Sequence, residues 1–236
     1  MTTWVRLGGL SPYAAVHRLQ EALVERVAAG SLGDVVLFLE HAPTITLGRK
    51  RDAEQSVIAP DGAPVVRVER GGDATWHAPG QLVVYPIVAL PEGRRDLHAA
   101  LRALEDSVIG LLGDLGLSAG RDPRNTGVWI DGHKVCSIGI AVRSWVTWHG
   151  LALNVDADLA GFGRIRPCGF DAEVMTRLAD HLRPCPSIDA LIPGLVAQLA
   201  THLHLDPSGP LLHAVVRDDA GADALLARLS GEVAAG

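Results

Sequence analysis

Apolar side chains recur every three or four residues along three long segments of the chain, which is the pattern of amphipathic helices. The first segment covers 11–30, where a serine N-cap and a proline open the helix and a glycine ends it. The second covers 97–116. The third, at 188–199, is predicted to be interrupted or restarted at Pro193. A weaker helical signal covers 220–229.

Shorter apolar runs between these helices are typical of strands. Two of them flank an Asp-Gly dipeptide at 131–132, which favours a type I′ turn and therefore predicts a hairpin. Helices and strands follow one another without a linker long enough to divide the chain, so we predict a single α+β domain over 1–236 with a mixed or antiparallel sheet. The expected strands are 34–40, 65–68, 82–88, 128–130, 134–142 and 146–155.

Composition and charge narrow the class of protein. Of the 236 residues, 48% are hydrophobic and 20% are charged, which excludes a disordered or fibrous chain. The longest apolar runs, 35–39 and 82–90, are too short to span a bilayer, and the first residues lack the basic and apolar regions of a secretion signal. We therefore expect a soluble, cytoplasmic protein. The formal net charge of −6 provides no global attraction to nucleic acid.

The densest group of polar residues lies at 70–81, between two expected strands. Its paired glycines allow the backbone to approach a ligand closely, and Arg70 and His77 add a cation and a titratable donor. The alternative is an ordinary turn between strands. The segment is not a phosphate loop, because it lacks the Gly-Lys-Ser/Thr ending. No metal site is expected, since His202 and His204 have no further ligand at a suitable spacing.

Lysine is rare: of the 21 basic residues only Lys50 and Lys134 are lysines. Arginine supplies a cation but does not give up its proton, so a retained lysine indicates a role in proton transfer. Strand alternation places Lys134 on one face with Cys136, Ile138 and Ile140, where desolvation would lower the pKa of the lysine. The alternative is a lysine whose stem packs on the core while its ammonium group reaches water.

The three cysteines are an odd number without metal-type spacing, which favours reduced thiols. Cys168 lies between a proline and a glycine in an expected turn, where Arg164 and Arg166 would favour its thiolate. Cys185 has a similar proline-rich setting, and Cys136 shares the face of the strand that carries the lysine. Each thiol also has the simpler interpretation of a small buried hydrophobic residue.

The strand at 146–155 carries one histidine, His149. Alternation of side chains along the strand predicts that His149 faces the same side as Leu151 and Leu153. A histidine on an apolar face is typically a hydrogen-bonded structural residue, and that is the alternative to a role at a site.

Several short motifs occur in one order along the chain. They are Glu40-His41-Ala42-Pro43, Thr46-Leu47-Gly48-Arg49, Arg70-Gly71-Gly72, His77-Ala78-Pro79-Gly80-Gln81, Gly127-Val128-Trp129, Lys134, Ser137-Ile138-Gly139, the segment 147–154 and Pro167-Cys168-Gly169. Together they resemble the octanoyltransferases of lipoate biosynthesis, most strongly over 34–178. The resemblance implies the α+β sandwich of the biotin and lipoate protein ligase catalytic domain.

The resemblance also implies a reaction and the residues that perform it. Octanoyl would pass from acyl carrier protein to Cys168 as a thioester and then to a lysine of a lipoyl domain, the first step of lipoate biosynthesis, without a cofactor. Lys134 would be the catalytic partner of Cys168. The implied substrate-binding residues are Arg70, Gly71, Gly72, Asp73, Ala74, Thr75, Trp76, His77, Ser137, Ile138, Gly139, His149, Gly150, Leu151 and Ala152.

The implied partners are octanoyl acyl carrier protein and the lipoyl domains of 2-oxoacid dehydrogenase complexes or of the glycine cleavage protein. Such partners are typically acidic, and candidate basic contacts are 49–51, Arg164 and Arg166. Two other enzymes remain open: an ATP-dependent lipoate protein ligase on the same fold, and a transferase that relays acyl groups between protein lysines. A non-catalytic acyl-binding module is the alternative from a different class.

Overall fold

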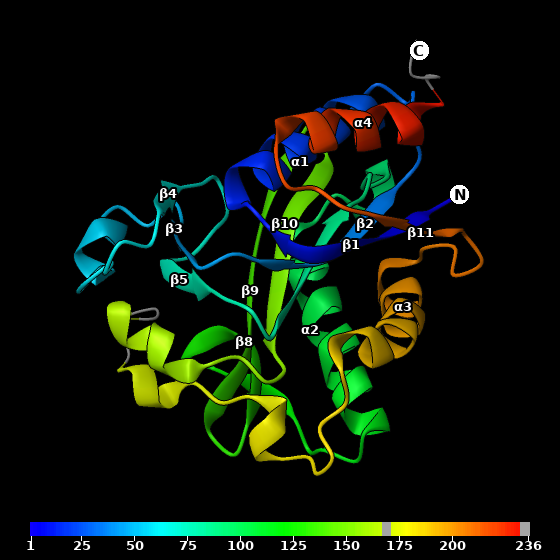
Figure 1. Ribbon diagram of the computed structural model, residues 1–236. Coiled ribbons are helices and arrows are strands. Elements are labelled where there is room, and N and C mark those ends of the chain that lie inside the picture. Colours follow the sequence, from blue (N-terminus) through cyan, green and yellow to red (C-terminus); the bar gives the residue numbers. More distant parts are fainter. Residues whose placement is uncertain (167–170, 232–236) are drawn as a thin grey trace.

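A mixed sheet of eight strands lies between two layers of helices in the computed structural model, which describes residues 1–166 and 171–231 (Figure 1). Strand β1 pairs in parallel with both of its neighbours, whereas the pairs from β2 across to β7 are antiparallel. The expectation of a mixed sheet in an α+β fold is therefore confirmed. In spatial order the strands are β11 (Leu211–Ala214), β1 (Thr3–Ser11), β2 (Val35–His41), β6 (Gln81–Ile87), β10 (Val146–Asn154), β9 (His133–Arg143), β8 (Asn125–Ile130) and β7 (Gly120–Asp122).

Helices α1 (Tyr13–Ala28) and α4 (Asp219–Ser230) cover one face of this sheet, and α2 (Leu97–Asp114) and α3 (Ile188–Leu203) cover the other (Figure 1). Side chains of a strand alternate between the two faces, so each central strand contributes to both cores. Along β6, for example, Val83 packs in the core beneath α1 and Val84 in the core beneath α2.

A second sheet of three strands lies beside the large one (Figure 1). Its order is β4 (Val65–Arg67), β3 (Thr44–Leu47) and β5 (Ala74–His77). A separate apolar core, which includes Trp76 and Phe162, supports it. The loop 68–73 that joins β4 to β5 also contacts the large sheet, because the amide of Gly71 donates a hydrogen bond to the carbonyl of Ile140 in β9 at 3.1 Å. Short 3-10 helices complete the structure: η1 (Ala53–Ser56), η2 (Glu92–Arg94), η3 (Leu159–Arg164), η5 (Ala172–Val174) and η6 (Leu178–Asp180).

The hairpin expected around the Asp-Gly dipeptide is confirmed. Asp131 and Gly132 have φ angles of 48° and 77°, the left-handed values that a type I′ turn requires, and β8 and β9 pair antiparallel on either side. The helix expected at 97–116 is confirmed as α2, where the carboxylate of Asp96 accepts hydrogen bonds from the backbone of His98 and Ala99.

The expected beginning of the first helix is wrong. Ser11 is the last residue of β1, its hydroxyl caps nothing, and Pro12 is the N-cap of α1. Strand β1 was absent from the predicted strands because Gly8 and Gly9 interrupt its apolar pattern, at a shift in the register with β2 between Arg6 and Leu10.

The interruption expected at Pro193 is also wrong, since α3 runs unbroken through it. Proline in a helix costs about 3 kcal/mol, because it removes a backbone donor and crowds the preceding turn. The buried stripe that includes Leu191, Leu195 and Leu199 packs against α2 and offsets that cost.

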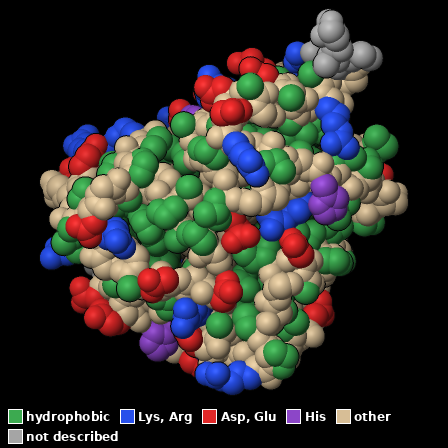
Figure 2. Space-filling view, viewed as in Figure 1, with side chains coloured by type: hydrophobic (Ala, Val, Ile, Leu, Met, Phe, Trp, Pro, Cys, Tyr) green, Lys and Arg blue, Asp and Glu red, His purple; other side chains and the backbone are tan. Residues whose placement is uncertain are grey.

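The described helices include none with the length and apolar character needed to cross a bilayer. On the face of the molecule shown in Figure 2, acidic and basic side chains are interspersed.

Candidate active site

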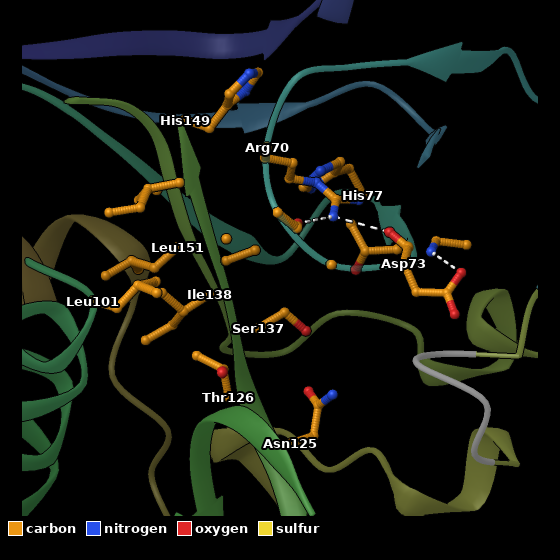
Figure 3. Close-up of a pocket in the computed structure, with 18 of the residues that line it drawn as sticks. Arg70, Asp73, His77, Leu101, Asn125, Thr126, Ser137, Ile138, His149 and Leu151 are labelled. Carbon is orange, nitrogen blue, oxygen red and sulfur yellow. Dashed lines mark hydrogen bonds between the residues drawn. The ribbon is translucent and has the colours of Figure 1, made fainter. Parts of the chain in front are cut away.

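A pocket of about 190 Å³ opens where the loop 68–73 meets β9, β10 and the first turn of α2 (Figure 3). Almost all of the residues implied by the motifs line it, although they come from three separate parts of the chain. Those residues are Arg70, Gly71, Gly72, Asp73, Ala74, Thr75, His77, Ser137, Ile138, Gly139, His149, Gly150, Leu151 and Ala152. Lys134 lines the same pocket, together with Tyr13, Tyr85, Leu97, Leu101, Asn125, Thr126 and Ile140.

Trp76 is the implied binding residue that does not line the pocket. Neighbouring side chains of a strand point to opposite faces, so Trp76 points away from Thr75 and His77, which do. Its ring packs over Gly161 in the core of the small sheet, with the guanidinium of Arg164 5.0 Å from the ring centroid. Trp76 therefore packs on the face of β5 that is opposite to the pocket.

Arg70 braces the loop that forms one wall of the pocket. Its guanidinium is buried and donates hydrogen bonds to the carbonyls of Gly71 at 3.1 Å, Asp73 at 2.9 Å and Thr46 at 2.9 Å (Figure 3). Gly72 has a φ of 88°, which a residue with a Cβ rarely adopts. These features hold the loop in one conformation.

Asp73 anchors the end of this loop. Its carboxylate accepts hydrogen bonds from Lys50 Nζ at 2.5 Å, Ser56 Oγ at 2.7 Å and the backbone of Ala74 at 2.8 Å. Burial opposes its ionisation, but these donors outweigh burial and lower the pKa of Asp73. Lys50, expected as a surface contact for partners, thus also supports the pocket wall, and it is exposed like Arg49, Arg51 and Arg166.

Buried aromatic and imidazole groups close the side of the pocket next to α1. His41 Nε2 lies 2.8 Å from the hydroxyl of Tyr85, which is also hydrogen-bonded to Tyr13. Burial lowers the pKa of His41 to about 4 and that of His77 well below its usual value, and it raises the pKa of Tyr13 to about 12. All of these groups are therefore uncharged at neutral pH, which suits a wall in contact with an apolar ligand.

An apolar surface extends from this wall towards α2. Leu101, Ile138 and Leu151 come from α2, β9 and β10 and lie together in the close-up (Figure 3). Asn125 and Thr126 lie at the other end of the pocket from His149 (Figure 3). The pocket thus joins a polar end to an apolar surface.

Lys134 lies at this polar end, near the start of β9. Its side chain is buried, with the residue only 5% exposed, and its Nζ donates a hydrogen bond to Asn125 Oδ1 at 2.5 Å. A Cβ on Gly127 would lie 2.6 Å from Lys134 Cε, so the glycine leaves room for the lysine stem. The interpretation of a lysine whose ammonium group simply reaches bulk water does not fit this burial.

Cys168 lies outside the described residues. The other two cysteines are poor nucleophiles. Cys136 is completely buried, which raises the pKa of its thiol to about 12. Burial also raises the pKa of Cys185, and its thiol faces the carbonyls of Val155 and Pro186. Both thiols are therefore protonated at neutral pH.

The predicted orientation of His149 is wrong. Its φ of 55° breaks the alternation of β10, and its ring packs against Trp148 and His17, in the layer of α1. Leu151 and Leu153 pack in the core on the side of α2. Neither ring nitrogen of His149 has a hydrogen-bond partner among the described residues, so the alternative of a hydrogen-bonded structural histidine does not fit.

Glu105 of α2 is a buried residue of this region that the sequence analysis missed. Its carboxylate accepts hydrogen bonds from the backbone of Gly127 at 3.0 Å and from Arg121 Nε at 2.6 Å. It thereby fixes the strand that presents Asn125 to Lys134. The sequence does carry a signal for this residue. Glu105 directly follows Leu104 in the apolar stripe of the helix, and a carboxylate buried there requires hydrogen-bond donors.

Replacing Glu105 with alanine is expected to lower the free energy of unfolding by about 1–3 kcal/mol, because the buried amide of Gly127 loses its acceptor. Urea denaturation followed by circular dichroism measures this. Asp106→Ala is the matched control, since Asp106 bonds to the same arginine from a more exposed position. It should cost less than about 1 kcal/mol. Equal losses in the two variants would contradict the structural role of Glu105.

Comparisons with known proteins agree with this geometry. The model of the family described as lipoyl protein ligase A/B catalytic domain matches residues 12–200. Curated octanoyltransferases of Geobacter metallireducens and Syntrophotalea carbinolica are 46% and 48% identical over 179 and 170 residues. These matches cover 75% and 72% of this chain, and 83% and 80% of those proteins.

Among solved structures, lipoate-protein ligase A bound with ATP has the same fold, with a TM-score of 0.70 and 18% identity. The similarity covers 98% of this chain and 95% of that one. The family resemblance and the fold expected from the motifs are confirmed, and so is the expectation of an enzyme.

Proposed function

The chain belongs to the family of lipoyl protein ligase A/B catalytic domains, and from that membership we propose that it transfers an octanoyl group from acyl carrier protein to a lysine of lipoyl domains. The observation that carries this proposal is the pocket. It joins a buried lysine to an apolar surface formed by Leu101, Ile138 and Leu151. An acyl chain on that surface would place its carbonyl near Lys134.

In the proposed first step, the thiolate of Cys168 attacks the carbonyl carbon of octanoyl-pantetheine on the carrier protein. The new bond joins the Cys168 sulfur to the acyl carbon, and the bond to the pantetheine sulfur breaks. As a neutral amine, Lys134 accepts the proton of the Cys168 thiol, and the ammonium group so formed returns that proton to the departing pantetheine thiolate. One thioester replaces another, so this step needs no ATP.

In the second step, the amine of a lipoyl-domain lysine attacks the Cys168 thioester. An amide bond forms, the Cys168 sulfur leaves, and the proton lost by the amine returns to sulfur by way of Lys134. The amide is more stable than the thioester, which drives the cycle forward. Asn125 supports this role, because its side-chain oxygen orients Nζ of Lys134 within the pocket.

Arg49, Arg51 and Arg166 are exposed cations in the segments proposed for contact with acidic partner proteins. Exposed charges of this kind increase the rate of association more than the affinity, and salt screens their effect.

Incubation with octanoyl acyl carrier protein and a lipoyl domain tests the proposal. We expect the domain to gain one octanoyl group, detected by intact mass, without ATP. Loading of free octanoate that requires ATP would instead identify a lipoate protein ligase. Transfer only from an octanoylated or lipoylated protein donor would identify a relay between lysines. Absence of any covalent adduct, with acyl binding retained, would overturn the proposal in favour of a binding module.

A further inference from the structure

Two imidazoles and a carboxylate from three different elements converge beside the pocket. His17 comes from α1, Glu69 from the loop before Arg70, and His149 from β10. One donor atom of each lies within 4.8 Å of the others. Glu69 Oε2 lies 3.1 Å from His17 Nε2 and 3.7 Å from His149 Nε2.

Of these three residues, His149 is the one whose ring nitrogens lack hydrogen-bond partners in the described part of the chain. Its side chain is 1% exposed, and neither ring nitrogen has a hydrogen-bond partner among residues 1–166 and 171–231. A buried polar group without a partner is costly, and such an exception in a native structure calls for an explanation. The ring is also held in place, since it stacks on Trp148 with 4.3 Å between centroids and its backbone amide donates to Gln20 Oε1 at 2.8 Å.

We propose that His17, Glu69 and His149 form a zinc-binding site. Two histidines and a glutamate are an established ligand set for Zn²⁺. Tetrahedral bonds of about 2.0–2.1 Å place neighbouring ligand atoms about 3.3–3.4 Å apart. The 3.1 Å and 3.7 Å separations around Glu69 are already close to that value.

The surroundings of the three ligands support binding. His17 Nδ1 lies 3.8 Å from a carboxylate oxygen of Glu21, whereas its Nε2 faces Glu69, so each ring nitrogen has a carboxylate nearby. Burial lowers the pKa of His149 to about 3, so its imidazole is neutral, the form that ligates. The cations Arg70 and Arg143 act on the same ring, and Glu21 pairs with Arg143 at 3.5 Å.

A zinc ion at this position would connect α1, the loop 68–73 and β10. His149 also lines the acyl pocket, so the ion would adjoin the end of the pocket away from Asn125 and Thr126 (Figure 3). Because the unfolded chain does not hold these three residues together, zinc would stabilise the folded protein by mass action.

Equilibrium dialysis of the metal-free protein against zinc chloride tests the site. We expect about one Zn²⁺ per chain and a higher thermal unfolding temperature. His17→Ala and Glu69→Gln should each weaken zinc affinity by about 100-fold or more, beyond the loss typical for an outer-shell partner. His202→Ala is the matched control: His202 precedes another nearby histidine, His204, but lies outside the proposed group, so this variant should bind zinc like the wild type.

Cobalt(II) provides a second readout. We expect ligand-field absorption of a four-coordinate ion with nitrogen and oxygen ligands, lost in His17→Ala. No zinc binding by a folded wild-type protein would overturn the proposal, as would unchanged affinity in both ligand variants. A thiolate-to-cobalt charge-transfer band would assign the metal to a cysteine and also overturn it. These measurements use no acyl substrate, so their outcome is separate from that of the proposed transferase activity.

Discussion

Cys168→Ala is expected to lower octanoyl transfer by about 10³-fold or more, because the proposed thioester cannot form without the sulfur. The wild-type enzyme, mixed with octanoyl acyl carrier protein in the absence of a lipoyl domain, should gain the mass of one octanoyl group. The alanine variant should gain none. Intact-mass spectrometry measures both, and peptide mapping locates the modified residue.

Cys136→Ala is the matched control for this experiment. Cys136 is completely buried, and the burial that raises the pKa of its thiol to about 12 keeps it protonated. Removing this sulfur should leave both the adduct and the rate of transfer close to those of the wild type. An octanoyl group mapped to Cys136, or normal transfer by Cys168→Ala, would refute the assignment of the nucleophile.

Lys134→Arg is expected to lower the turnover number by about 10²–10⁴-fold, the range that general acid–base catalysis contributes. Arginine keeps the positive charge but does not release its proton at neutral pH. The site is also fitted to lysine, because Asn125 Oδ1 accepts a hydrogen bond from its Nζ at 2.5 Å and the missing side chain of Gly127 makes room for its stem. Single-turnover formation of the acyl-enzyme measures the effect directly.

Lys50→Arg is the control for this substitution, since Lys50 is the other lysine of the chain. Its ammonium group pairs with Asp73 from a side chain that is 53% exposed, and arginine can make the same ion pair there. Turnover should stay within about threefold of the wild-type value, since surface pairs contribute little. Near-normal turnover of Lys134→Arg would exclude proton transfer by Lys134 and leave it with an electrostatic role.

Local signals in the sequence predicted much of the fold. The apolar stripe from Leu104 to Leu112 predicted α2, because a helix that buries one face must repeat its apolar residues at that spacing. The Asp131-Gly132 dipeptide predicted the hairpin, since few residues tolerate two successive positive φ angles. The motifs also indicated most of the residues that line the pocket, although Trp76 does not line it and Cys168 lies outside the described residues.

Features that depend on contacts between distant segments could not be predicted in the same way. Strand β11 is short and partly exposed, and its parallel pairing with β1 joins segments some 200 residues apart. The path of α3 through Pro193 depended on packing against α2. Local preferences amount to a few kcal/mol, and tertiary contacts outweigh them at such positions.

Residue types and their periodicity along the chain therefore specified the main helices and the central strands, because each of these elements buries one face or both and its apolar residues recur at the spacing of a helix or a strand. Which distant residues meet was decided by tertiary packing alone. The convergence of His17, Glu69 and His149 has no periodic signature, since it depends on how α1, a loop and β10 are placed against one another. The positive φ of His149, which turns its ring towards that group, likewise exists only where the surrounding structure holds it.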